Sequence, residues 1–350
     1  MSDILNVRDL RVYFDTYAGQ VKAVRGVSFH VREREVLAIV GESGCGKSVT
    51  SKAIMRLLDH TSARILEGSV VEFQGKDLIQ LTKGELNKIR GSRISMIFQD
   101  SMTSLNPTTT VGKQIIENIR NHEKVSRAEA MKRAEELLKL VGIPHPAERL
   151  KNYPHQMSGG MRQRAMIAIA LACNPTLLIA DEPTTALDVT IQAQLLDLLS
   201  DLKEKLGMSI ILVTHDLGIV AGFADRIQVM YAGQIVERGT TRDIFNRPKH
   251  PYTWALLSSI PGRAVESKSE LYSLKGTPPD LLLPLECCPF AARCEYCMPI
   301  CRKQNPPEYE IDGEHRVSCW LCHELAPQVE PPSSLLEVIR AENSEAEDHE

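Results

Sequence analysis

Apolar residues in the first forty positions follow the pattern of β-strands. Residues 5–11 and 21–29 alternate between apolar and polar or run apolar, and they are rich in β-branched side chains. Residues 35–40 form a nearly continuous apolar run, typical of a fully buried strand, which leads directly into a glycine-rich turn. The chain is therefore predicted to open with strands of a sheet.

Further along, helical and strand spacing alternate. Residues 126–140 start with the spacing of a capping box and continue with apolar residues at helical intervals. Residues 176–180 and 209–213 are two more buried-strand candidates, and residues 190–206 between them fit an amphipathic helix. This alternation predicts an α/β fold with a largely parallel sheet covered by helices.

The composition of the sequence changes after about residue 261. Proline pairs appear there, and seven of the nine cysteines lie between Cys287 and Cys322. A small, loop-rich extension is predicted. The segment from Glu337 to the end is strongly acidic, so we expect a solvated tail.

Composition excludes several classes of protein. The chain has 350 residues, of which 43% are hydrophobic and 25% charged, as in an ordinary globular protein. A net charge of -4 gives no case for binding nucleic acid. Without an apolar run of 18 residues or a signal-peptide pattern, the chain is expected to be cytoplasmic with reduced thiols. Clustered cysteines then favour a metal over disulfides.

Residues 41–48 match the phosphate-binding P-loop pattern G-x-x-x-x-G-K-S/T. Its glycines let backbone N–H groups turn inward around an anion, and the start of the following helix reinforces this. Lys47 is predicted to reach the β- and γ-phosphates, and Ser48 to ligate Mg²⁺. The alternative, a glycine-rich turn with an exposed lysine, is disfavoured by the buried strand before the turn. The predicted contacts of the loop with nucleotide are Gly41, Ser43, Gly44, Cys45, Gly46, Lys47, Ser48 and Val49.

Four polar residues that follow apolar strands extend this site. Asp181 ends one strand and is predicted to hold Mg²⁺, while Glu182 beside it polarises the attacking water. Acidic pairs at strand ends are often merely solvated, but a P-loop in the same chain favours catalysis. His215 follows the next strand, and its spacing favours a γ-phosphate contact over a structural role. Gln99 follows a shorter apolar strand and would be unremarkable alone.

Together these residues resemble the nucleotide-binding domain of an ATP-binding-cassette (ABC) protein over roughly residues 3–260. The matching elements are Gln99 for the Q-loop, Ser158, Gly159, Gly160 and Met161 for the signature loop, Ala186, Leu187 and Asp188 for the D-loop, and His215 for the switch histidine. The resemblance implies a head-to-tail dimer in which each ATP lies on one P-loop and is capped by the partner's signature loop. It also implies Mg²⁺ held through Ser48, Gln99 and Asp181.

Two positions depart from the usual ABC pattern. The signature loop ends in Met161, where glutamine is commoner, although Arg-Gln-Arg follows it as expected. The aromatic residue that stacks on adenine has two candidates: Phe14 fits best by position, and an insertion at residues 15–19 makes Tyr17 its rival.

A narrower resemblance covers nearly the whole chain. It rests on residues 157–164, on His-Pro-Tyr-Thr at 250–253, on Gly-Thr-Pro-Pro at 276–279 and on Cys-Pro-Phe-x-x-Arg-Cys at 288–294. These motifs are similar to those of ATPase subunits of oligopeptide and dipeptide importers, a group that includes nickel and glutathione importers. The implied partners are a second, related ATPase chain, two transmembrane permease subunits and an extracytoplasmic binding protein, with the Gln99 region contacting a permease.

This resemblance gives the predicted domains and location. The chain would be peripheral on the cytoplasmic face of the inner membrane. The expected divisions are an ABC domain at 1–260 with a helical subdomain at about 100–170, a Cys-rich extension at 261–330 and an acidic tail at 331–350.

Three interpretations of the cysteines remain open. The pattern of the family's C-terminal region picks out Cys288, Cys294, Cys301 and Cys319, and four thiolates suit a 4Fe-4S cluster. A zinc site is the alternative, because 294–297 and 319–322 are both C-x-x-C pairs. The third interpretation is a set of free thiols in a small core.

Other classes of ABC protein fit less well. A soluble ABC ATPase acting on DNA would carry a long coiled coil between Lys47 and Asp181, and no sustained heptads occur there. Translation-type members usually hold two cassettes, whereas this chain has one P-loop. An exporter ATPase would lack the cysteine-bearing extension.

Overall fold

The computed structural model describes residues 2–59, 61–100, 104–184, 188–260, 276–333, 335, 336 and 339. The chain divides into two compact units, each assembled from several segments. Unit 1 comprises Met1–Leu5, His30–Val36 and Glu72–Val213, and unit 2 comprises Asn6–Phe29, Leu37–Val71 and Thr214–Glu350.

Unit 1 contains a parallel sheet of buried strands. Strand β8 (Leu177–Asp181) pairs in parallel with β7 (Ile94–Ile97) on one side and with β9 (Ser209–Thr214) on the other. Every residue of these three strands is buried, which explains why each appears in the sequence as a short continuous apolar run. The strands predicted at 176–180 and 209–213, and their parallel arrangement, are confirmed.

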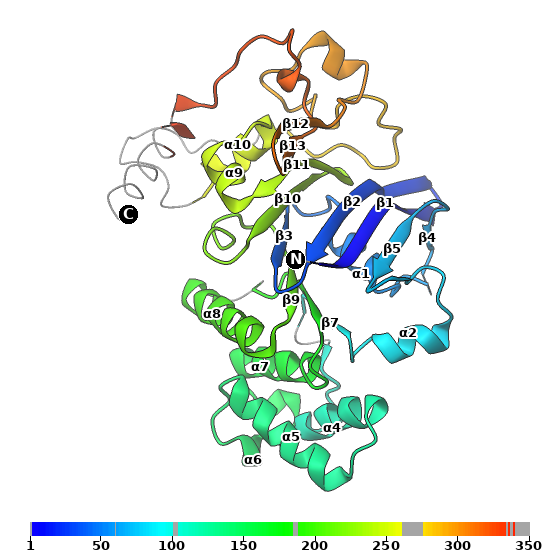
Figure 1. Ribbon diagram of the computed structural model, residues 1–350, viewed down its shortest axis with the longest axis vertical. Helices are drawn as coiled ribbons and strands as arrows, with labels where there is room; N and C mark the ends of the chain where they lie inside the picture. The colour runs from blue at the N-terminus through cyan, green and yellow to red at the C-terminus, as the bar shows by residue number, and fades with distance from the viewer. Residues whose placement is uncertain are drawn as a thin grey trace. The chain divides into compact units, whose positions relative to one another are not determined.

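Helices make up much of the rest of unit 1. Four of them, α4 (Val111–His122), α5 (Arg127–Leu140), α6 (Pro146–Arg149) and α7 (Gly159–Ala170), pack against one another, as Figure 1 shows. The other two helices in the described part of this unit are α2 (Lys83–Ile89) and α8 (Val189–Leu206), and a 3₁₀ turn covers Pro154–Gln156. The helices predicted at 126–140 and 190–206 are confirmed. Within the described residues, no helix is both long and apolar enough to cross a membrane.

Helix starts in unit 1 are set by side-chain caps. The hydroxyls of Thr110, Ser126 and Ser158 and the carboxylate of Asp188 each accept the backbone N–H three residues later, at the starts of α4, α5, α7 and α8. The Ser126 cap is the one that the sequence predicted. Gly207, at φ +65°, ends α8 in the left-handed conformation.

Unit 2 holds a mixed sheet. Strand β10 (Arg226–Tyr231) is parallel to β3 (Val36–Val40) and antiparallel to β11 (Gln234–Thr240). Helix α1 (Lys47–Ile54) follows β3, and α9 (Thr241–Asn246) and α10 (Pro251–Ser258) follow β11. The N-terminal strands include antiparallel β1–β4 and β5–β6 pairs, and they are β1 (Asp3–Thr16), β2 (Gly19–Arg32), β4 (Ala63–Ile65), β5 (Val70–Phe73) and β6 (Lys76–Asp77). Of these, β6, the end of β5, the start of β1 and the end of β2 are assigned to unit 1.

The cysteine-bearing extension adds strands to this sheet. Its hairpin, β12 (Tyr309–Asp312) and β13 (His315–Val317), pairs with β11 through β13. Two 3₁₀ turns, Pro299–Arg302 and Trp320–Cys322, flank the hairpin. The sequence predicted loops here but not the added strands, because segments of three and four residues are too short to show a reliable alternation.

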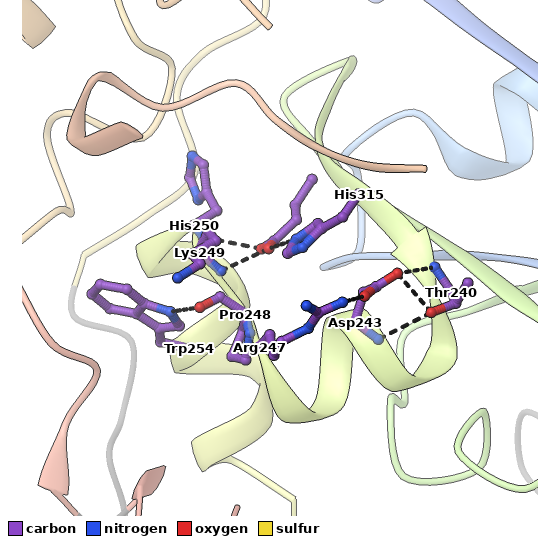
Figure 2. A network of polar contacts seen from close by, with 9 residues as sticks. Thr240, Asp243, Arg247, Pro248, Lys249, His250, Trp254 and His315 are labelled. Atoms are coloured by element: carbon purple, nitrogen blue, oxygen red, sulfur yellow. Dashed lines mark hydrogen bonds and ion pairs between the residues drawn. The ribbon is translucent and has the colours of Figure 1, made fainter. Parts of the chain in front are cut away.

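A buried histidine–glutamate contact joins β13 to β11 (Figure 2). His315 Nε2 lies 2.8 Å from the Glu237 carboxylate, and both side chains are fully buried. Glu237 also accepts backbone N–H groups from Lys249, at 2.7 Å, and His250, at 3.0 Å. A buried carboxylate is tolerated when it is both paired and hydrogen-bonded in this way. The network therefore fixes the extension and the start of α10 to the same strand.

Candidate nucleotide-binding site

The P-loop is the turn between β3 and α1 in unit 2. Gly44 and Gly46 have φ values of +81° and +105°, in the region that L side chains rarely adopt. At Gly46 an added Cβ would lie 2.4 Å from the Ala23 carbonyl oxygen and 2.8 Å from Met230 Cε. At Gly41 it would lie 2.1 Å from the Met230 carbonyl oxygen. The loop therefore packs closely on its neighbours, which only glycine permits at these points.

Lys47 lies inside this loop. Its side chain is buried, and Nζ donates to the carbonyl oxygens of Gly41, at 2.7 Å, and Glu42, at 3.0 Å. The Cys45 thiol is also buried, and burial raises its pKa despite the nearby Lys47. The other predicted contacts range from exposed, for Ser43 and Gly44, to half-buried, for Ser48 and Val49. The ammonium is thus directed into the turn of the P-loop.

Three residues predicted to act on Mg²⁺ and the attacking water lie in unit 1. Asp181 ends β8 with only 1% of its surface exposed, and the neighbouring Glu182 is also buried. Glu182 has a φ of +47°, a left-handed conformation that is uncommon for a residue other than glycine. Its N–H donates to the Val213 carbonyl at 2.9 Å, and its carboxylate accepts the Gln99 side-chain amide at 2.9 Å. The structure thus brings Gln99 and Glu182 together at the ends of neighbouring strands.

His215 and the adenine candidates lie in unit 2. His215 is exposed immediately after β9, in a turn in which Asp216 accepts the N–H of Gly218 at 2.7 Å. Phe14 is half-buried on β1 opposite Ala63. Tyr17 projects fully into solvent.

The predicted signature loop forms the start of α7 in unit 1. Ser158 caps the helix by accepting the Met161 N–H at 3.3 Å, and no acidic residue lies in the first turn. A Cβ added at Gly159 or Gly160 would meet no atom within 4 Å, so this helix end is open. An open helix N-terminus presents N–H groups and a partial positive charge to an anion. Of the predicted D-loop, Asp188 caps α8, while Ala186 and Leu187 lie outside the described residues.

The structure adds contacts to the P-loop that sequence reasoning missed. The Glu42 carboxylate binds the Arg293 guanidinium of the extension, and the Glu42 N–H donates to the Tyr252 hydroxyl at 2.8 Å. Arg293 and Tyr252 both belong to motifs that carry the resemblance to peptide importers. The motifs mark Arg293 and Tyr252 as residues of interest in the sequence, but a motif alone does not show that these residues contact Glu42.

These features define a P-loop nucleotide-binding protein: a buried strand leads into a glycine-rich loop that encloses a lysine, and a helix follows the loop. An acidic pair at the end of a parallel strand is a further feature of that class.

Comparison with known proteins narrows the class. The family profile described as ABC transporter matches residues 24–185, and the profile of the oligopeptide/dipeptide transporter C-terminal region matches residues 236–301. The chain is 55% identical to the oligopeptide transport ATP-binding protein OppD of Bacillus subtilis (strain 168), across 96% of this chain and 94% of that protein. It is also 55% identical to the dipeptide transport ATP-binding protein DppD of the same organism, across 92% and 95%.

Solved structures agree. A dimeric, post-hydrolysis structure of the ATP-binding cassette MJ0796 bound to ADP and Pi aligns with a TM-score of 0.61 and 29% identity, covering 68% of this chain and 99% of that one. The cbiO1 structure from Clostridium perfringens aligns with a TM-score of 0.60 and 29% identity, covering 71% and 92%. The chain therefore belongs to the ABC transporter family, in the group of oligopeptide and dipeptide transport ATP-binding proteins, and the fold predicted for its cassette is confirmed.

Proposed function

We infer that this chain is the ATP-hydrolysing subunit of an importer for dipeptides or oligopeptides. The observation that carries this inference is the 55% identity to both OppD and DppD over more than nine-tenths of the chain. The match of residues 236–301 to the C-terminal region of peptide transporters supports it independently of the cassette.

The catalytic roles proposed here follow the chemistry of each group. Lys47 would bind the β- and γ-phosphates, and Ser48, Gln99 and Asp181 would hold Mg²⁺, which would neutralise phosphate charge. Glu182 orients the attacking water, and its hydrogen bond from the Gln99 amide fixes the position of the carboxylate. His215, exposed at the end of β9, contacts the γ-phosphate.

The open end of α7 supports a role for a second subunit. We assign Ser158, Gly159, Gly160 and Met161 to the ATP of the partner and Asp188 to the dimer contact, with Phe14 stacking on adenine. A closed helix end could not receive another chain's phosphates, whereas the glycines at this one leave it accessible.

The complete assembly would contain a second, related ATPase chain, two transmembrane permease subunits and an extracytoplasmic binding protein. In it, the cassette at 1–260, with its helical subdomain at about 100–170, would lie peripherally on the cytoplasmic face of the membrane. The segment 261–330 would form the Cys-rich extension, and 331–350 a solvated tail.

Isolation of the intact complex from native membranes tests this function. Mass spectrometry should find two permease subunits and peptides in the copurified binding protein. Bound nickel or glutathione would instead identify a related importer. Copurification of ribosomes or DNA without permeases would refute the transport function.

Several thiols of the extension interact with one another. Cys288, Cys301 and Cys319 are buried, the Cys288 N–H donates to the Cys301 carbonyl at 2.9 Å, and Cys319 interacts electrostatically with Cys322, Cys288 and Cys294. Burial raises the pKa of Cys288 to about 12 and that of Cys294 to about 11. Backbone hydrogen bonds oppose this rise at Cys288, Cys294, Cys301 and Cys319. Such bonds stabilise thiolates and help to set cluster potentials.

Two other cysteines belong to the same group of thiols. The Cys297 thiol donates to the Met298 carbonyl at 3.6 Å and interacts with Cys288, Cys294 and Cys301. Cys322 interacts with Cys319, and also with Glu237 and Lys249. Among the residues the structure describes, no group of three or more His, Cys, Asp or Glu side chains is placed to hold a metal ion. The choice of Cys288, Cys294, Cys301 and Cys319 over a zinc site that uses Cys297 and Cys322 therefore rests on the pattern of the family's C-terminal region.

We propose that these four cysteines hold a 4Fe-4S cluster, which ties together an extension with little core of its own. Protein purified without oxygen should be brown and contain matching iron and sulfide. Cys319→Ser should abolish the colour, whereas Cys322→Ser should keep it. A colourless protein with stoichiometric zinc would contradict the proposal and favour the zinc alternative.

A further inference from the structure

A bidentate ion pair connects the P-loop of this chain to the C-terminal extension. Arg293 lies in the Cys-Pro-Phe-x-x-Arg-Cys motif, and its side chain is 5% exposed. Its two terminal nitrogens donate to the two Glu42 carboxylate oxygens, at 2.6 Å and 3.0 Å. Glu42 is the second residue of the P-loop, so the contact spans 251 positions of sequence. A bidentate guanidinium–carboxylate pair fixes orientation as well as distance.

Aromatic rings support this pair. The Tyr231 hydroxyl accepts a hydrogen bond from Arg293 at 3.3 Å, and the Tyr252 hydroxyl accepts the Glu42 N–H at 2.8 Å. The Tyr231 ring centre lies 4.6 Å from that of Tyr252 and 5.3 Å from that of Phe290. Residues from the end of β10, from α10 and from the extension therefore converge on one P-loop residue.

The charge of Glu42 makes this contact relevant to nucleotide binding. Its backbone carbonyl accepts the Lys47 ammonium at 3.0 Å, so the residue is part of the turn expected to surround the phosphates. A carboxylate there repels phosphate and competes for Lys47 unless a cation neutralises it. Arg293 supplies that cation through its two hydrogen bonds to the Glu42 carboxylate.

We propose that Arg293 is a positioning residue for ATP binding, acting through Glu42. It holds the P-loop turn in place and cancels the Glu42 charge, so the Cys-rich extension is a working part of the nucleotide site. Arg293 directly precedes Cys294, so any change in the thiol cluster that moves this segment also moves the guanidinium. The proposal rests on the assignment of residues 41–48 as the ATP site.

The affinity of the purified full-length chain for Mg-ATP, measured by calorimetry, tests the proposal. Arg293→Ala should weaken binding by about tenfold or more, because a charge-assisted bidentate contact is lost and a carboxylate is left unpaired. Adding Glu42→Gln to this variant should restore most of the affinity, since the repelling charge is removed. Arg293→Lys should be intermediate, because lysine keeps the charge but not the fork. The exposed Arg302 provides a matched control in the same extension, and Arg302→Ala should bind like the wild type.

Steady-state hydrolysis gives a second readout. The KM for ATP should rise in Arg293→Ala while kcat stays within about threefold, because Arg293 contacts no reacting atom. Wild-type affinity in Arg293→Ala would overturn the proposal. Equal weakening of Arg293→Ala and of the double variant would also overturn it, because collapse of the extension would then explain the loss. A wild-type chain that bound no ATP would refute the P-loop assignment itself.

Discussion

Glu182 combines three features at one position: burial, a left-handed backbone and a hydrogen bond from Gln99. Such strain persists at functional sites where the surroundings hold it in place. We predict that Glu182→Gln keeps ATP binding but lowers kcat by at least about 100-fold, the usual contribution of a general base. Turnover assays and gel filtration with ATP should then show an inactive, ATP-stabilised dimer. Unchanged hydrolysis would contradict the role given to Glu182.

Alanine substitutions at two glycines of the P-loop distinguish the cost of backbone strain from the cost of a steric clash. Both Gly44 and Gly46 have positive φ, but only at Gly46 would a Cβ collide, at 2.4 Å from the Ala23 carbonyl oxygen. Gly44→Ala should therefore cost only the backbone strain, on the order of 1 kcal/mol. Gly46→Ala should lower the free energy of unfolding further and weaken ATP binding, because the turn must shift. If both variants lowered the free energy of unfolding in urea by the same amount, the predicted steric clash at Gly46 would be contradicted.

At the scale of secondary-structure elements, the cap of α10 introduces a pH dependence. His250 Nδ1 accepts the Tyr252 N–H at 3.0 Å, and burial lowers the pKa of His250 to about 3. The unfolded chain takes up this proton below pH 6.5, whereas the folded chain does not, so His250 reduces stability as pH falls from 6.5 toward 3. The slope of this contribution is about 1.4 kcal/mol per pH unit.

A variant isolates this contribution from those of other groups. His250→Asn retains a capping oxygen but does not titrate. As pH is lowered from about 6.5, the unperturbed pKa of histidine, the wild type should lose more unfolding free energy than this variant. A difference independent of pH would contradict a neutral, buried His250.

The elements that the sequence predicted are those with strong local signals. The P-loop, the Ser126 cap and the apolar runs of β3, β8 and β9 each occupy a few consecutive residues, so their pattern is visible in the chain. The β12–β13 hairpin is too short to show a period. The Glu42–Arg293 pair depends on the fold, because nothing local to either residue indicates a partner 251 positions away.

At the scale of the whole molecule, the residues predicted to act on nucleotide are found in both units. The P-loop and His215 lie in unit 2, and Gln99, Glu182 and the α7 signature loop lie in unit 1. The role proposed for Arg293 adds the extension to this set, so a change at the thiols beside Arg293 is predicted to alter ATP affinity.

The central claim, that this chain powers peptide import, is tested most directly by uptake in proteoliposomes. The reconstituted complex with its binding protein should accumulate labelled peptide when ATP is supplied on the side of this chain. The same complex carrying Lys47→Ala, a residue buried inside the P-loop, should accumulate none. ATP-dependent peptide uptake that persisted with Lys47→Ala, or a wild-type complex that hydrolysed ATP without moving peptide, would contradict the account.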